Sequence, residues 1–204
     1  MDRAGYEVSG VDIVDQPRYP FQFQQGDAIE ASLNGFDFVW ASPPCQRYSR
    51  MSQCRPRTVS LYPDLIGAIR QKLKNWGGCW VIENVAGAPL RDPIMLCGMM
   101  FDLKLYRHRY FESSHSIFSP PHPPHSKPAS RAGHWIPGTI CSVAGNCAPI
   151  ALAREAMGIN WMMRDELAEA IPPAFSEYIV RHFARLPENG ITGAPTDRDR
   201  LARD

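Results

Sequence analysis

Two short hydrophobic runs, each followed by polar residues, stand out along the chain. They cover residues 36–41 and 79–82 and have the length and composition of buried strands. Between them, apolar residues recur at helical spacing until a glycine pair ends the run: Leu65, Ile66, Ile69, Leu73 and Trp76 precede Gly77 and Gly78. The pattern predicts a β-α-β unit. Its two parallel strands would present their polar ends at the sheet edge where open α/β sheets bind ligands.

The residues after the two strands bear reactive groups. Pro43-Pro44-Cys45-Gln46 offers a thiol, and Glu83-Asn84-Val85 offers a carboxyl. A lone cysteine is more often a small buried hydrophobic residue than a nucleophile. We therefore expect five of the cysteines to be buried hydrophobic residues: Cys54, Cys79, Cys97, Cys141 and Cys147. Six scattered cysteines in a chain of this length also do not suggest a disulfide framework. The pairing of thiol and carboxyl distinguishes Cys45 and Glu83.

These motifs together resemble the DNA (cytosine-5) methyltransferases, whose nucleophile lies in a Pro-Cys-Gln loop and whose partner carboxylate lies in Glu-Asn-Val. Three further segments follow in the family's order: residues 105–109 resemble its Gln-x-Arg-x-Arg element, 154–159 its Arg-Glu element and 171–179 its closing helix. Ordered motifs are more specific than a single tripeptide. The resemblance implies an α/β fold with a Rossmann-like methyltransferase sheet.

The resemblance also implies a mechanism. Cys45 would add to C6 of a cytosine flipped out of double-stranded DNA, so that C5 can take the methyl group of S-adenosylmethionine. Glu83 would stabilise the charge at N3, and Arg107 and Arg109 would hold the ring carbonyl and the sugar-phosphate. Because an ordinary thiol is only slightly ionised at neutral pH, a cation or helix N-terminus should lie near Cys45.

The cofactor half of the resemblance is incomplete. Asp12 corresponds to the residue with which the family holds the ribose of the cofactor. Asp27 corresponds to a residue whose side chain approaches the adenine. Pro43 is the third residue that we assign to the cofactor site. The chain starts after the family's Asp-x-Phe-x-Gly-x-Gly turn, so we expect an N-terminally truncated sheet that lacks its first, central strand. Leu105 replaces the family's glutamine, and Glu169-Ala170 replaces Gly-Asn. Weak or absent binding of S-adenosylmethionine follows.

A basic loop surrounds the thiol. Residues 38–63 contain no Asp or Glu, although the net charge of the whole chain is only +1. An arginine cluster is more often a solvated loop, but its position beside Pro43-Pro44-Cys45-Gln46 favours contacts with DNA phosphates. The residues assigned to DNA binding are Gln46, Arg47, Arg50, Arg55 and Arg57.

The sequence divides into four regions. Residues 1–112 form the catalytic core and 113–153 a short, irregular, acid-free recognition insert rich in proline and histidine; 154–183 return as helices to the core, and 184–204 form a flexible tail. A zinc site from His122, His125, Cys141 and Cys147 is an alternative for the insert. No recognised finger spacing is present, so we expect no metal there.

Composition agrees with an intracellular enzyme. The 204 residues are 44% hydrophobic, enough for one core, and lack both a long apolar run and a signal peptide, so the cytoplasm is the expected location. The predicted function is methylation of cytosine C5 in DNA. The enzyme could belong to a restriction-modification system or a phage, or act as an orphan methyltransferase. The alternatives are a non-catalytic remnant that binds DNA and thymidylate-synthase-type chemistry on a nucleotide. The order of Glu-Asn-Val and Arg-x-Arg argues against the latter.

Overall fold

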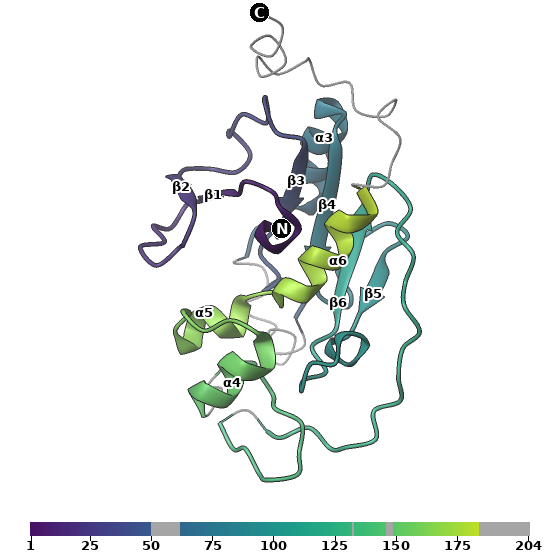
Figure 1. Cartoon of the computed structure of the whole chain (residues 1–204). Coiled ribbons are helices and arrows are strands. Elements are labelled where there is room, and N and C mark those ends of the chain that lie inside the picture. The colour runs from purple at the N-terminus through teal and green to yellow at the C-terminus, as the bar shows by residue number, and fades with distance from the viewer. Residues whose placement is uncertain (50–61, 132, 146–148, 184–204) are drawn as a thin grey trace, which may run out of the picture.

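The chain folds as a mixed α/β protein in the computed structural model, which describes residues 1–49, 62–131, 133–145 and 149–183 (Figure 1). Its main sheet has four strands in the order β3-β4-β6-β5. The bounds are Phe38–Ala41 for β3, Cys79–Asn84 for β4, Ile94–Leu96 for β5 and Arg109–Ser113 for β6. None of the helices in the described part of the chain has the length and apolar character needed to cross a membrane.

The predicted β-α-β unit is confirmed. Strands β3 and β4 pair in parallel, from Phe38 opposite Cys79 to Ala41 opposite Ile82, and helix α3 (Ile66–Trp76) connects them. Gly77 ends the helix in the left-handed region, at φ 80°, which a glycine adopts without strain. The strand bounds differ from the prediction: β3 begins two residues later, and β4 extends through Glu83 and Asn84. The carboxyl therefore lies within a strand rather than after it.

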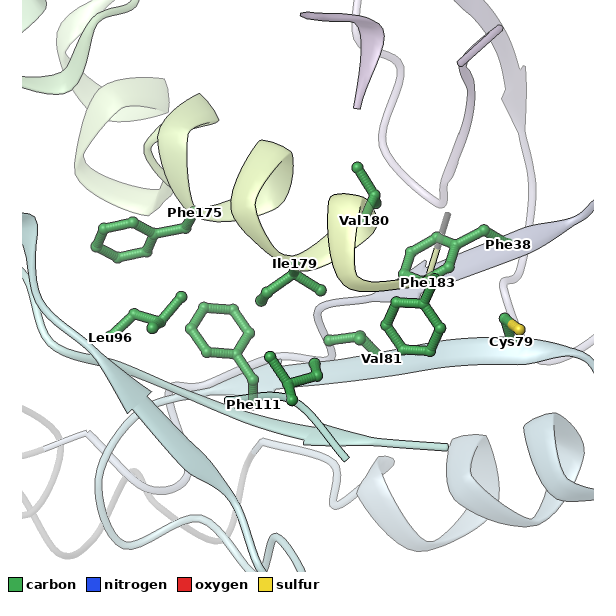
Figure 2. Close-up of a cluster of buried hydrophobic side chains, with 10 residues drawn as sticks. Phe38, Cys79, Val81, Leu96, Phe111, Phe175, Ile179, Val180 and Phe183 are labelled. Atoms are coloured by element: carbon green, nitrogen blue, oxygen red, sulfur yellow. The ribbon is translucent and has the colours of Figure 1, made fainter. Parts of the chain in front are cut away.

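Helices cover both faces of the main sheet. Helix α6 (Pro173–Phe183) lies on one face, where Figure 2 shows Phe175, Ile179, Val180 and Phe183 packed over Phe38, Val81, Leu96 and Phe111. Helix α3 covers the other face, with Ile69 and Leu73 against Trp80 and Ile82. Alternate residues of a strand face opposite sides, so Glu83 shares the α6 face with Val81.

The main sheet also contains antiparallel strands that the hydrophobic pattern did not predict. Strand β6 pairs antiparallel with β4 on one side, where Phe111 lies opposite Glu83, and with β5 on the other. A short 3-10 helix, η2 (Gly98–Phe101), follows β5. Because β6 lies directly beside β4, the arginines at its start reach the carboxyl end of that strand.

A second, two-stranded sheet stands apart from the first. Strands β1 (Ser9–Asp12) and β2 (Gln22–Gln25) pair in parallel, after a 3-10 turn, η1 (Asp2–Ala4). The resemblance implies a strand near residues 7–11, which would be the second strand of the family's sheet; β1 begins two residues later and ends one residue later. Within the described residues β1 has no strand partner other than β2, and it is not hydrogen-bonded to β3.

The C-terminal helices α4 (Ile150–Met157) and α5 (Arg164–Glu169) form a second core cluster below the sheet. Leu105, 1% exposed, is buried in this cluster with Val143, Ala153 and Leu167. This packing gives a physical reason for an apolar residue at position 105, where the resembled family has glutamine. Between β6 and α4 the chain runs as a long irregular segment, with two isolated bridges in its described part (Figure 1).

Candidate active site

The thiol and carboxyl loops are tied together at the end of the sheet. Strand β3 ends at Ala41, and the next four residues lead to Cys45, whose carbonyl accepts hydrogen bonds from the backbone N–H groups of Tyr48 and Ser49, both at 3.0 Å. The side chain of Asn84, fully buried, donates from Nδ2 to the carbonyl of Pro43 at 2.9 Å. Asn84 thereby fixes the loop that carries the thiol to the strand that carries the carboxyl.

Glu83 forms a buried ion pair with Arg109. The Nε of Arg109 lies 2.9 Å from Oε1 of Glu83, and the two side chains are 15% and 7% exposed. Ser42 also hydrogen-bonds Glu83 and itself accepts a bond from Nε1 of Trp40 at 3.0 Å. The carboxyl is thus held from two sides, by a cation on β6 and by a hydroxyl after β3.

Burial makes Glu83 easier to protonate than an exposed carboxyl. Burial raises its pKa above the ordinary value, while Arg109, the hydrogen bond from Ser42 and the charge of Arg107 oppose that increase. A carboxyl with a raised pKa holds a proton closer to neutral pH. This is the property a general acid requires when it acts on a ring nitrogen.

The Cys45 thiol is not ionised in advance. Burial raises its pKa; Arg109 lowers it and Glu83 raises it. The predicted cation is therefore present as Arg109, but desolvation outweighs its effect. No helix N-terminus meets the thiol within residues 1–49, where a turn follows Cys45. Ionisation of Cys45 must be coupled to changes in the charges around it.

Arg107 contacts the protein backbone. Its Nη1 donates to the carbonyl of Val143 at 2.5 Å and its Nη2 to that of Ala168 at 2.7 Å. These bonds clamp the end of the insert and helix α5 to the start of β6. In this structure Arg107 holds the proline- and histidine-rich insert in place, whereas Arg109 is the arginine in direct contact with Glu83.

The three residues assigned to the cofactor line one hollow. Asp12, Asp27 and Pro43 all border a cavity of about 610 Å³ between β1 and β3. The carboxylate of Asp12 accepts from the N–H of Val14, and that of Asp27 from the N–H of Ile29, both at 2.8 Å. Each carboxylate therefore has a fixed orientation at the cavity wall, where it can accept hydrogen bonds from ligand hydroxyl or amino groups.

The closing segment borders the same region. Glu169 lines the cavity between β1 and β3 and also a neighbouring hollow of about 680 Å³, together with Asp12, Pro173 and Ser176. Its charge is one of the influences that raise the pKa of Cys45. The residue in place of the family's Gly-Asn therefore adds a negative charge beside the thiol.

The residues assigned to DNA are only partly described. Gln46 borders the cavity, and its buried Oε1 accepts no hydrogen bond from the part of the chain described here. Arg47 donates from Nη1 to the carbonyl of Tyr62 at 3.0 Å, which joins the two ends of the basic loop. Arg50, Arg55 and Arg57 lie outside the described residues.

The sequence did not indicate four contributions to this site. They are the side chains of Trp40, Ser42 and Glu169 and the hydrogen bond from Asn84 to the carbonyl of Pro43. Asn84 lies within the Glu83-Asn84-Val85 motif and Ser42 directly precedes Pro43-Pro44-Cys45-Gln46, which is the only signal that pointed to them. Comparison with protein-family models finds no match for this chain, and no curated protein matches it.

Proposed function

We propose that the protein acts on cytosine in DNA as a (cytosine-5-)-methyltransferase, with Cys45 as nucleophile and Glu83 as acid. The observation that carries the proposal is the convergence of Cys45, Glu83 and Arg109 at one end of the β3-β4-β6 sheet. Arg109 is paired with Glu83 and influences the thiol pKa as well. Residues distant in sequence are thereby combined into a nucleophile, a proton donor and a cation.

The chemistry assigned to each residue is as follows. The Cys45 thiol loses its proton and forms a bond from sulfur to C6, while Glu83 gives a proton to N3, so that the electron pair of the broken C5–C6 double bond becomes available at C5. S-adenosylmethionine supplies the electrophilic methyl group. Once the methyl group is on C5 and S-adenosylhomocysteine remains, a base removes the hydrogen from C5, the C5–C6 double bond re-forms, the Cys45 thiolate leaves and N3 returns its proton to Glu83. Arg109 keeps Glu83 oriented throughout.

The strand arrangement supports a Rossmann-like assignment. The two sheets read β2-β1 and β3-β4-β6-β5, and the resembled family places one further strand between the equivalents of β1 and β3. The large apolar side chains Val11 and Phe36, 37% and 44% exposed, border the cavity there. Aspartates and apolar walls suit a nucleoside, so Asp12 and Asp27 are the residues that would hold the ribose and adenine of S-adenosylmethionine.

Binding of S-adenosylmethionine to the 204-residue chain should be weak or undetectable, because the open space between β1 and β3 leaves one side of the cofactor without backbone contacts. A ligand held at one end also loses the orientation that methyl transfer requires. Calorimetric titration measures this directly. Micromolar affinity in a well-folded monomer would contradict the expectation.

A trapping experiment tests the proposed function without the cofactor. DNA with 5-azacytosine in place of cytosine takes a thiolate at C6 and a proton at N5, which leaves the enzyme covalently attached. We expect a denaturation-resistant complex with the wild-type chain and none with Cys45→Ser. The rate should stay nearly constant with pH between the pKa values of Glu83 and Cys45 and fall on either side, because addition requires the Cys45 thiolate together with a protonated Glu83.

Cys54→Ser is the matched control, since Cys54 lies in the same basic loop, nine residues after Cys45. This variant should form the complex at the wild-type rate. A folded wild-type chain that binds DNA and forms no adduct would instead support the non-catalytic remnant, which the open sheet and the un-ionised thiol favour. An adduct that persists in Cys45→Ser would show that the nucleophile is another residue.

A further inference from the structure

Four potential metal ligands converge beside the sheet, away from Cys45. They are the Sγ of Cys97 and one ring nitrogen each of His108, His122 and His125, and all four atoms lie within 4.8 Å of one another. Cys97 is buried and the three histidines are exposed. Nothing in the proposed methylation chemistry uses any of them, so the cluster requires its own explanation.

Two pairs of ligand atoms have separations close to those in a tetrahedral zinc site. Zinc binds thiolate sulfur at about 2.3 Å and imidazole nitrogen at about 2.0–2.1 Å, which gives tetrahedron edges of about 3.3–3.6 Å. In the structure Sγ of Cys97 lies 3.3 Å from Nε2 of His125, and Nε2 of His108 lies 3.2 Å from Nε2 of His122. Two opposite edges therefore have nearly the required length already.

The ligands come from three separate parts of the chain. Cys97 directly follows β5, His108 directly precedes β6, and His122 and His125 lie in the proline-rich insert as Pro-Pro-His-Pro-Pro-His. Prolines restrict the backbone and reduce the conformational entropy lost when two histidines are fixed together. The site would fasten the insert to the strands from which the candidate catalytic arginine projects.

Neighbouring groups orient the ligands. The ring of His125 stacks on Tyr106, with centroids 3.7 Å apart and planes 10° apart. The Tyr106 hydroxyl donates to the carbonyl of Lys127 at 2.5 Å and accepts from its N–H at 3.1 Å, which fixes the insert just beyond His125. The stacking restricts rotation of the His125 ring, so less conformational freedom is lost when this imidazole binds a metal.

We propose that Cys97, His108, His122 and His125 bind one structural zinc ion that fastens the insert to the sheet. One thiolate and three imidazoles suit zinc among the common divalent metals, and four protein ligands fill a tetrahedral site without an open position for a substrate. The proposal is independent of the proposed methyltransferase function.

The assignment departs from the sequence analysis in its ligand set. His122 and His125 belong to the site, but Cys141 is buried in the second core cluster, and Cys147 lies outside the described residues. Cys97 and His108 take their places. Sequence spacing missed them because they flank a hairpin, β5 to β6, whose pairing places them together.

Zinc content of the purified full-length chain is the direct test. After removal of metal with a chelator and titration with zinc alone, we expect one ion per chain and an increase in the melting temperature. His122→Ala and His125→Ala should each weaken zinc binding about tenfold or more, whereas His134→Ala, which changes an exposed histidine of the same insert, should leave it unchanged. Less than one zinc per folded wild-type chain overturns the proposal.

Cobalt substitution identifies the sulfur ligand. Co²⁺ in a tetrahedral site with one thiolate gives visible d–d absorption and a sulfur-to-cobalt charge-transfer band in the near ultraviolet. That band should disappear in Cys97→Ser and persist in Cys141→Ser. If Cys97→Ser retains both the band and stoichiometric zinc, the cluster is a set of hydrogen-bonded, stacked imidazoles and not a metal site.

Discussion

Glu83→Gln is expected to slow attack on the cytosine ring by about 10²–10⁴-fold, the usual size of a general acid–base contribution. The amide keeps the shape of the side chain and can accept the hydrogen bond from Arg109, but it cannot give a proton to N3. The exchange of the cytosine C5 hydrogen with solvent measures the effect. This exchange requires addition of Cys45 to C6 and needs no methyl donor, so it can be followed with the chain as it is.

DNA affinity separates this chemical effect from a binding effect. Glu83→Gln should leave affinity nearly unchanged, whereas Arg57→Ala should weaken binding and reduce its dependence on salt by about one phosphate contact. Urea unfolding of Glu83→Gln is a necessary companion measurement, because Arg109 loses its charged partner. Equal losses of affinity in the two variants would mean that their roles are divided incorrectly.

Glu112→Gln should lower the free energy of unfolding by about 3–5 kcal/mol, the usual effect of removing one partner of a buried ion pair. Arg70 on α3 donates to both carboxylate oxygens of Glu112 on β6, at 2.6 and 2.7 Å. The two side chains are 10% and 5% exposed. The substitution leaves the guanidinium charge buried without its counter-ion. Urea denaturation with a fitted midpoint and slope measures the loss.

The same pair fixes the loop that follows Glu83 and Asn84. Arg70 also donates to the carbonyl of Pro89 at 2.7 Å, and Glu112 accepts from the N–H of Arg91 at 2.9 Å. Glu112→Gln should therefore loosen this loop in hydrogen exchange before the protein unfolds globally.

Two controls calibrate the stability prediction. Glu177→Gln breaks an exposed pair with Arg181, one helical turn away, and should cost about 0.3–0.5 kcal/mol. The double variant Arg70→Met with Glu112→Leu should recover much of the loss, because well-packed apolar residues often replace a buried pair at little cost. A change below about 1 kcal/mol in Glu112→Gln would show that water reaches the pair.

Local sequence patterns predicted the elements formed by local interactions. Apolar spacing and the glycine pair defined α3, and the hydrophobic runs defined β3 and β4, with their parallel pairing implied by the helix between them. Strand ends were displaced by up to two residues, because the sheet pairs Phe38 and leaves Phe36 exposed. The same local reasoning placed the thiol and the carboxyl at one sheet edge.

The position of β6 shows what sequence patterns could not specify. Its alternation is weak, and nothing local indicates that it inserts between β4 and β5. That order nevertheless brings Arg109 to Glu83 and Glu112 to Arg70. It also places Cys97 beside His108, whose spacing matched no known metal motif.

The sequence by itself determined the β-α-β unit, the placement of Cys45 and Glu83 near the ends of its two strands, and the irregular insert, since each depends on residue type and short-range periodicity. Only the tertiary structure decided how these groups are charged and held. Burial raises the pKa of both Cys45 and Glu83. Arg109, at the start of the antiparallel strand β6, opposes this increase for both groups. Desolvation and long-range strand pairing depend on the whole fold, so no local pattern encodes them.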